Sequence, residues 1–432
     1  MADPIFDIIF GSSSAEEDVK RWISEGFVFS SSIPWGLRQT YGGPCAVLAP
    51  VQAFIIADLL TKSLMPDPTV DECQSSLVEA ISFMLWRARP DFNAPACFRN
   101  TSYASLDSLK ADLASYNLST SGAVVEFVRG LISTRTVEGI KKDLSFDSDP
   151  FVSRFGHGTQ ELVNLCLFGR AFSHLFDGNR FLAPNMEICG VPCRGRVGFL
   201  SQLEVLQYQK VGNWCRFPEL PIWIIASSTH YTVLFALDLD VGKISDCQVQ
   251  EHRAEAEFSK YDQSESGFIS IQDLPALLCN LGRDDLTTPD RFNQLKAAVD
   301  SEGCGVVLWP LLWESLRPGA QADGPWACIA CTYLNITNQS ECEMCSTPAP
   351  ARPPTVQENE SPGPDQFLLY HYNGIENHIG AQAQCTEVAV TVMDTEGIPQ
   401  GQTTNSGLRE VIQTRWHGAI VEFPSDLVPK IT

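Results

Sequence analysis

The chain has 432 residues, of which 44% are hydrophobic and 19% are charged. This composition is typical of a globular protein and excludes a disordered one, and the length allows two or three domains. The formal net charge of −22 argues against a nucleic-acid partner, because binding to phosphates needs a basic face.

The N-terminal residues Met-Ala-Asp-Pro-Ile-Phe-Asp lack the basic region and the long apolar stretch of a signal peptide. The most hydrophobic stretch, 220–239, is interrupted by Ser227, Ser228, Thr229 and His230, so it predicts two strands and a turn rather than a membrane span. Four of the fifteen cysteines form a tight cluster and most of the others stand alone in apolar segments. This pattern favours reduced thiols in the cytoplasm or the nucleus. We expect no membrane partner, because no stretch predicts a membrane span. The sequence leaves the oligomeric state open.

Cys45 is the candidate nucleophile. It ends the motif Gln39-Thr-Tyr-Gly-Gly-Pro-Cys45 and precedes an apolar run of helix length, 46–60. Unpaired amide N–H groups and the positive dipole end at a helix start favour thiolate over thiol. Gln39 can direct its side-chain N–H₂ at the oxyanion that forms when a thiolate attacks a carbonyl. The alternative is a buried cysteine that only packs, but it leaves Gln39, the two glycines and the helix start unexplained.

Up to about residue 240 the pattern mixes amphipathic helices with a few strands. A glycine turn at Phe155-Gly-His-Gly leads into a helix that we expect to be capped near Thr159. Helices are predicted at 107–117 and 121–134, and strands at 221–225 and 231–237.

A nucleophilic cysteine needs a histidine that takes its proton and later protonates the leaving amine. Among seven histidines, His230 is the strongest candidate, because it opens a predicted strand directly after a polar turn. Papain-like folds place their base in this way, on a sheet edge far downstream of the nucleophile. His371, which also lies on a predicted strand, is the second candidate, and for any one histidine a structural role is the alternative.

From 251 to 316 the pattern changes to four short helices with two acidic loops. The first loop, 262–273, matches an EF-hand loop except at its last position, where Asp273 replaces the longer glutamate and weakens calcium binding. The second loop begins at Asp300 and has leucines where oxygen ligands are needed. A helix-loop-helix pair without metal is therefore favoured over a calcium site. The ligands of such a calcium site would be Asp262, Ser264, Ser266 and Asp273.

Two C-x₂-C pairs separated by ten residues follow at 328–345. This spacing predicts a tetrahedral structural zinc site. The segment is too short to fold on its apolar content, so the metal would supply most of its folding free energy. The predicted ligands are Cys328, Cys331, Cys342 and Cys345.

The cysteine pattern, W-x-C-x₂-C-x₃-N-x₆-C-x₂-C, resembles the NZF zinc-finger family, which contains ubiquitin binders and RNA binders. Ubiquitin binders carry a Thr-Phe pair after the second cysteine and an apolar residue between the last two. This chain has Thr332, Tyr333 and Met344 at these positions, and the finger has no arginine for RNA. The resemblance therefore implies ubiquitin binding through these three residues.

A Pro/Glu/Ser-rich linker separates the finger from a final segment in which strand patterns return at 367–372, 387–393 and 419–423. A segment made mostly of strands cannot easily bury itself alone, so we expect it to complete the first domain. The predicted organisation is a catalytic domain at 1–245 and 366–432, a helical insert at 246–318, a zinc finger at 324–348 and a linker at 349–365.

The segment Gly42-Gly-Pro-Cys-Ala-Val-Leu-Ala-Pro-Val-Gln52 resembles the nucleophile motif of the MINDY family of deubiquitinases, in the branch with a Gly-Gly-Pro-Cys form. An EF-hand-like insert also occurs in this branch. The similarity runs from about Gly26 to the C-terminal segment, interrupted by the zinc module and its linkers. Further blocks that resemble this branch are Pro221-Ile-Trp-Ile, Ser228-Thr-His230-Tyr-Thr-Val, Gly156-His-Gly-Thr-Gln, Phe176-Asp-Gly and Tyr370-His-Tyr-Asn-Gly374.

The resemblance implies an α+β, papain-like cysteine protease that hydrolyses isopeptide bonds in polyubiquitin, with a preference for lysine-48-linked chains. It implies Cys45 as nucleophile, His230 as general base and acid, and Gln39 as oxyanion donor. A non-catalytic ubiquitin-binding adaptor that uses the zinc finger is the alternative function. The residue that orients His230 stays open between Asp238, Asp240 and Asn373.

Overall fold

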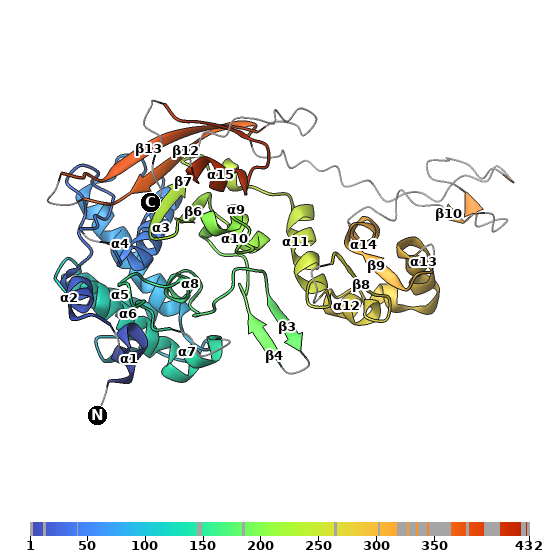
Figure 1. The fold of residues 1–432 in the computed structure, drawn as a ribbon, viewed down its shortest axis with the longest axis horizontal. Coiled ribbons are helices and arrows are strands. Elements are labelled where there is room, and N and C mark those ends of the chain that lie inside the picture. Colours follow the sequence, from blue (N-terminus) through green and yellow to red (C-terminus); the bar gives the residue numbers. More distant parts are fainter. Residues whose placement is uncertain are drawn as a thin grey trace. The chain divides into compact units, whose positions relative to one another are not determined.

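The computed structural model describes residues 3–11, 14–40, 42–144, 149–183, 186–262, 266–300, 303–317, 326–327, 334–335, 344, 364–376, 380–392, 407–424 and 429. The chain divides into two units (Figure 1). The first unit consists of Met1–Asn179, Glu187–Lys243 and Gly363–Thr432. The second consists of Arg180–Met186 and Ile244–Pro362.

The first unit is built around α3 (Cys45–Thr61), a helix whose residues are almost all buried. A helix that is hydrophobic on every side needs neighbours all round it. Two further helices, α4 (Val70–Arg87) and α8 (Gln160–Phe168), pack against α3, as do the sheet strands β6 (Ile222–Ala226) and β7 (Tyr231–Phe235). The nucleophile candidate therefore starts the most enclosed helix of this unit.

Local signals in the sequence account for several helix boundaries. A capping box of Thr69 and Glu72 begins α4. Thr159 stands at the N-cap of α8 as expected, but its side chain makes no capping hydrogen bond. The predicted helices near 107–117 and 121–134 are confirmed as α5 (Leu106–Ser115) and α6 (Ala123–Arg135). The remaining helices of this unit are α1 (Pro4–Phe10), α2 (Glu16–Ser24), α7 (Val137–Asp143), α9 (Gln202–Val205), α10 (Asn213–Arg216), α15 (Gly407–Gln413) and the 3₁₀ turn η1 (Leu239–Gly242).

One six-stranded sheet combines strands from the middle of the chain with strands from its C-terminal segment, in the order β14-β13-β12-β7-β6-β5. Strand β12 pairs antiparallel with β7, in a register that places Tyr372 opposite Val233. The end of β12 and the start of β7 therefore lie next to each other, on the same side of the sheet along the strand direction. In Figure 1 the orange C-terminal strands lie beside the green strands of the earlier segment. The other strands of this sheet are β5 (Gly198–Ser201), β12 (Gln366–Asn373), β13 (Gln384–Thr391) and β14 (Ile420–Glu422).

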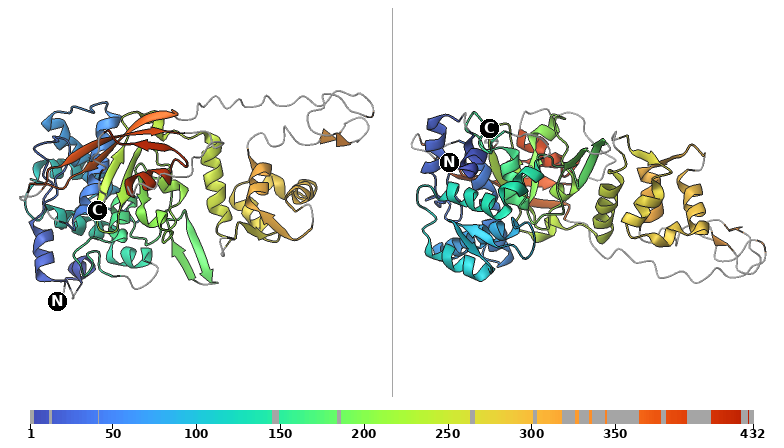
Figure 2. Two further views of the ribbon diagram at one scale, coloured as in Figure 1. Left: turned by 45° about the horizontal axis from the view of Figure 1, so that its top comes forward. Right: turned by 90° about the horizontal axis from the view of Figure 1, so that it is seen from below.

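Side chains that alternate along these strands fill two separate cores. Val233, Phe235 and Tyr372 join the large core that contains α3. Leu234 and Leu369 join a smaller core with residues of α15 on the opposite face. The sheet thus lies between two helical layers (Figure 2), and the expectation of an α+β fold is confirmed.

The hydrophobic stretch 220–239 forms β6, a polar turn and β7, as the sequence predicts. Within the part of the chain that the structure describes, no helix is long and apolar enough to cross a bilayer. The cysteines of the described residues are all free. Two short hairpins in residues 96–189 lie outside the main sheet: β1 (Ala96–Phe98) with β2 (Thr101–Tyr103), and β3 (Asn179–Ala183) with β4 (Met186–Cys189).

The second unit contains the four predicted helices, arranged as two helix-loop-helix motifs. The loops are joined by an antiparallel pair in which Ile269 lies opposite Val307. Each loop is closed by one carboxylate: that of Asp262 accepts the N–H of Gly267 at 2.7 Å, and that of Asp300 accepts the N–H of Gly305 at 3.0 Å. The elements are α11 (Asp246–Phe258), β8 (Phe268–Ser270), α12 (Leu274–Asn280), η2 (Asp284–Thr287), α13 (Pro289–Val299), β9 (Val306–Leu308) and α14 (Trp309–Leu316).

Most of the predicted zinc finger and its linker lie outside the described residues. Within the finger the structure describes a pair of two-residue strands, β10 (Trp326–Ala327) and β11 (Leu334–Asn335), and the exposed Met344. The predicted residues outside the described part are Ser264, Cys328, Cys331, Thr332, Tyr333, Cys342 and Cys345.

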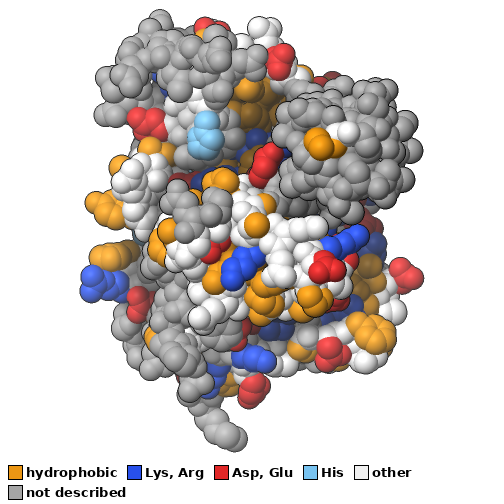
Figure 3. Space-filling view, turned by 90° about the vertical axis from the view of Figure 1, so that its right-hand side faces the viewer, with side chains coloured by type: hydrophobic (Ala, Val, Ile, Leu, Met, Phe, Trp, Pro, Cys, Tyr) orange, Lys and Arg blue, Asp and Glu red, His pale blue; other side chains and the backbone are white. Residues whose placement is uncertain are grey.

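On the face shown in Figure 3, acidic and basic side chains are interspersed with hydrophobic ones over the residues drawn in colour. The net charge of −22 is therefore not gathered into one acidic patch on that part of the surface. Such a mixed surface favours solubility.

A buried ion pair between Arg135 and Asp143 yields a stability prediction for the first unit. The guanidinium binds the carboxylate through two hydrogen bonds of 2.6 and 2.8 Å, and Asp143 also accepts the N–H of Ala171. We expect Asp143→Ala to lower the free energy of unfolding by about 3–5 kcal/mol, because it leaves a buried charge unpaired. Chemical denaturation measures this change. The control is the double variant Arg135→Met/Asp143→Leu, which should recover most of the loss, and equal loss in both variants would contradict the explanation.

Candidate active site

Cys45 is the first residue of α3, after Pro44 at the N-cap, and its side chain is 2% exposed. The preceding Gly43 has a φ of 121°, a conformation that L side chains rarely adopt. This turn brings the carbonyl oxygen of Gly43 within 3.7 Å of Cys45 Sγ, and the thiol donates a hydrogen bond to that oxygen. The glycine in the motif is thus required by the backbone that positions the nucleophile.

The thiol is surrounded by hydrogen-bonding groups from separate parts of the chain. Burial raises the pKa of the Cys45 thiol, while hydrogen bonds with the backbone of Tyr231, Gly43 and Ala46 and with the side chain of Gln39 lower it. Burial outweighs the others, so the free chain holds a neutral thiol at physiological pH. The contact with Gln39 brings together two of the three predicted catalytic residues.

His230 lies directly before β7, and Tyr231 next to it contacts the thiol. The side chain of Ser227 closes the turn by accepting the His230 N–H at 3.1 Å. Burial lowers the pKa of His230, a hydrogen bond to Asn373 raises it, and the charge of His157 lowers it. The imidazole is therefore neutral at physiological pH and able to accept a proton.

Among the three candidates for orienting His230, Asn373 is the one that the structure places in hydrogen-bond contact with its side chain. Its Oδ1 lies 3.2 Å from His230 Nε2 and also accepts the N–H of Ile375 at 3.1 Å. Nε2 then carries the proton that it donates to Asn373, which leaves Nδ1 as the acceptor for the thiol proton. Of the other two candidates, Asp238 accepts the N–H of Asp240, and Asp240 forms an ion pair with Lys243. Sequence reasoning left this choice open because Asn373 is 143 positions away from His230.

Gln39 is held by the same end of β12. Its N–H donates to the carbonyl of Gly374 at 2.7 Å, and its carbonyl accepts the N–H of Glu376 at 2.9 Å. The side chain is buried beside Cys45. One segment, 373–376, therefore positions both His230 and Gln39.

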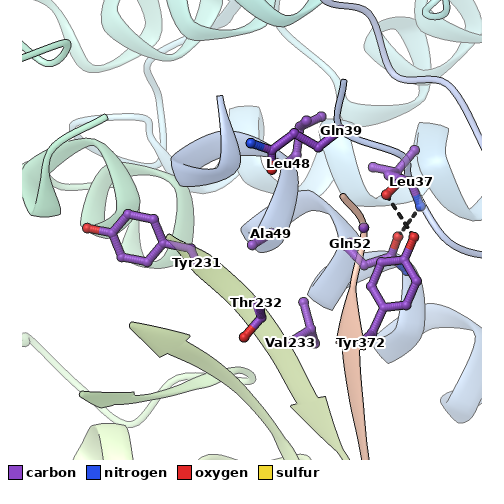
Figure 4. Close-up of a pocket in the computed structure, with 10 residues that line it drawn as sticks. Leu37, Gln39, Leu48, Ala49, Gln52, Tyr231, Thr232, Val233 and Tyr372 are labelled. Atoms are coloured by element: carbon purple, nitrogen blue, oxygen red, sulfur yellow. Dashed lines mark hydrogen bonds between the residues drawn. The ribbon is translucent and has the colours of Figure 1, made fainter. Parts of the chain in front are cut away.

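A second set of contacts, which sequence reasoning missed, holds the backbone of the segment directly before Gln39. Gln52 of α3 binds the N–H of Leu37 and the carbonyl of Trp35, and the hydroxyl of Tyr372 donates to the carbonyl of Leu37 at 2.8 Å. Figure 4 shows these two side chains converging on Leu37 beside a small pocket that Gln39 also lines. The signal in the sequence was a buried polar residue, Gln52, within an apolar helix.

His371, the second candidate for the base, lies on the sheet face opposite α3. Its Nε2 is 2.9 Å from Thr232 Oγ1, and burial lowers its pKa to about 3. A histidine in this position stays neutral and bonded within the sheet. This placement favours His230 as the base.

Comparisons with known proteins identify the family of this chain. The sequence model described as "Deubiquitinating enzyme MINDY-3/4, conserved domain" matches residues 7–108 and 96–266. The human protein named ubiquitin carboxyl-terminal hydrolase MINDY-3 is 28% identical over 484 residues, which cover 99% of this chain and 98% of that protein.

Two further relatives support the same assignment. The Drosophila melanogaster homolog of MINDY-3 is 22% identical over 99% of this chain and 82% of its own length. The mouse protein named probable ubiquitin carboxyl-terminal hydrolase MINDY-4 is 29% identical over 55% of this chain and 37% of its own length. No solved structure matches the chain. Because the matching family model covers more than half of the chain, the protein belongs to the MINDY-3/4 family of deubiquitinating enzymes.

Proposed function

We propose that this protein is a cysteine-type deubiquitinase that hydrolyses isopeptide bonds in polyubiquitin. The observation that carries the proposal is the meeting of Cys45 and Gln39 with Tyr231, the residue directly after His230, at one buried site. Relatives that cover nearly the whole chain carry the name ubiquitin carboxyl-terminal hydrolase. Lysine-48-linked chains are the proposed substrate because the sequence resembles a family with that preference.

The proposed reaction begins when His230 Nδ1 takes the thiol proton as Cys45 Sγ attacks the carbonyl of ubiquitin's C-terminal glycine. The side-chain amide of Gln39 donates to the oxygen that becomes negative. Collapse of this intermediate breaks the C–N bond, His230 gives the proton to the lysine amine, and a thioester remains. Water, activated by His230, then hydrolyses the thioester and frees the thiol.

A papain-like arrangement is the fold that we propose for the first unit. A cysteine at a helix start, a histidine at the start of a sheet strand and an asparagine on the neighbouring strand form the Cys-His-Asn set of such proteases. The hydrogen bond between His230 and Asn373 supports this assignment.

The second unit contributes two further proposals. Cys328, Cys331, Cys342 and Cys345 would hold a structural zinc, since four thiolates suit a closed tetrahedral site. The EF-hand-like pair would be stabilised without calcium: the Asp262 carboxylate already accepts hydrogen bonds from the backbone and hydroxyl of Ser266 and from the backbone of Gly267.

The first test of function is Cys45→Ala. Wild-type protein should form a covalent adduct with a ubiquitin that carries a C-terminal electrophile, and Cys45→Ala should form none, because no other thiol lies beside His230 in the proposed site. Gel shift and mass spectrometry measure the adduct, and Cys73→Ala, a buried cysteine of α4, is the matched control. Folded wild type that binds ubiquitin without reacting would instead indicate the adaptor function.

The second test concerns Asn373 and pH. Since only neutral His230 accepts the thiol proton, kcat/KM should fall as the pH drops through the His230 pKa, which burial places below its usual value. Asn373→Ala removes a hydrogen bond that raises this pKa, so the acid limb should move to lower pH and kcat should fall roughly 10- to 100-fold. Asn373→Asp places a negative charge there, so the acid limb should move to higher pH. Asp238→Asn is the control, and identical profiles for all variants would refute the orienting role.

The third test concerns the zinc finger. Met344→Ala and Thr332→Ala should each weaken ubiquitin binding about tenfold, because a few contact residues carry most of the affinity of an interface. Fluorescence anisotropy with labelled ubiquitin measures the Kd. Leu311→Ala, an exposed leucine of α14, should leave binding unchanged, and full affinity in both finger variants would refute the contact assignment.

A further inference from the structure

The loop 153–158 forms a tight turn directly before α8. The Ser153 N–H donates to the carbonyl of His157 at 2.8 Å, and the Gly156 N–H donates to the carbonyl of Ser153 at 2.8 Å. The turn therefore has a defined shape, and His157 lies in its second half.

This loop lies against the turn that carries the nucleophile. The Gly158 N–H donates at 3.3 Å to the carbonyl of Gly43, the same oxygen that accepts the Cys45 thiol. A Cβ on Gly158 would lie 2.3 Å from the Cβ of Ala46, and one on Gly43 would lie 2.4 Å from the carbonyl oxygen of Gly156. The two backbones touch because glycines stand at both sides of the contact.

The far side of the loop is anchored to α2. The carbonyl of Gly156 accepts the indole N–H of Trp22 at 2.9 Å and the guanidinium of Arg21 at 3.2 Å, and Arg21 is paired with Asp18 at 2.8 Å. Trp22 is fully buried. His157 is thus held on a fixed support and does not depend on a substrate for its position.

The imidazole of His157 lies close to the turn that carries Cys45. A Cβ on Gly42 would be 3.9 Å from His157 Cε1, and the charge of His157 acts on His230. His157 Nδ1 is buried, and no protein group forms a hydrogen bond with it. Such an atom in a native structure requires an explanation, since nearly all buried polar atoms have a partner.

A ubiquitin tail has groups that could serve as this partner. Its last two residues are glycines, so this part of the substrate offers only backbone N–H and C=O groups for recognition. An imidazole nitrogen binds either group, according to its tautomer. Cys45 is 2% exposed and His157 Nδ1 is buried close to the same turn, so both groups must become accessible when a substrate binds.

We propose that His157 is a substrate-binding residue whose Nδ1 forms a hydrogen bond with the backbone of the Gly-Gly tail, and so directs the scissile carbonyl to Cys45. This inference rests on the proposed deubiquitinase function and adds a residue outside the set of Cys45, His230 and Gln39. Other charged or titratable groups on the elements packed around this loop are Arg154, which stacks on Phe155 of the same loop, Arg21 and Asp18 of α2, and Glu161 of α8.

The kinetic test uses a fluorogenic ubiquitin conjugate with the full chain. His157→Ala should raise KM about tenfold and change kcat little, since it removes an interaction present in both the bound substrate and the transition state. His157→Gln should recover most of the KM, because its amide still forms the hydrogen bond. Both variants should move the acid limb of kcat/KM to higher pH, because the charge that lowers the His230 pKa is gone.

The control is His417→Gln, an exposed histidine after α15, which should match wild type in KM and pH profile. Thermal melting of each variant checks the fold, and if His157→Ala does not fold, the pH profile of His157→Gln decides. Wild-type KM and an unmoved acid limb in both variants would show that His157 has a structural role only, and would overturn the proposal.

A binding cycle separates this proposal from the proposed function. In a Cys45→Ala chain, removal of the Gly-Gly tail from ubiquitin should weaken binding about tenfold when His157 is present and much less in the His157→Ala background. The comparison between full-length and truncated ubiquitin cancels any contribution of the zinc finger. A tail effect that is equal in both backgrounds overturns the role of His157. Absence of labelling in wild type overturns the enzymatic function alone.

Discussion

The antiparallel pairing of β12 with β7 is the interaction on which the site depends. It brings the end of one strand beside the start of another that precedes it by more than a hundred residues. Asn373 then lies against His230, and the backbone of 374–376 binds Gln39. Most of the second unit lies between these two strands in the sequence, and both strands belong to the first unit.

Burial favours the neutral forms of Cys45 and His230, the proposed catalytic pair. It raises the pKa of the Cys45 thiol and lowers that of His230, so both groups are neutral in the free chain. In the proposed reaction the thiol proton therefore passes to His230 as the sulfur attacks the substrate carbonyl. Beside Cys45 the turn 42–45 meets the loop 153–158, and glycines allow the two backbones to come this close.

Rigid surroundings keep this small site in place. The helix α3 is buried on all sides, and its Gln52 holds the segment before Gln39 together with Tyr372 of β12. Both side chains satisfy backbone groups of Leu37 inside the core, where an unpaired polar group would cost about 1–3 kcal/mol. The position of Gln39, the proposed oxyanion donor, therefore depends on both the packing of α3 and the pairing of β12.

By itself the sequence determined the features that have local signals. An apolar run after small residues predicts Cys45 at a helix start, a polar turn before a strand pattern predicts the position of His230, and period and turn residues predict the helices and strands. Only the tertiary structure decided that Asn373 orients His230 and that Gln52 and His157 lie against the site. The physical reason is that the register of distant strands and the contact between two glycine turns depend on the whole packed core, of which no local pattern carries a record.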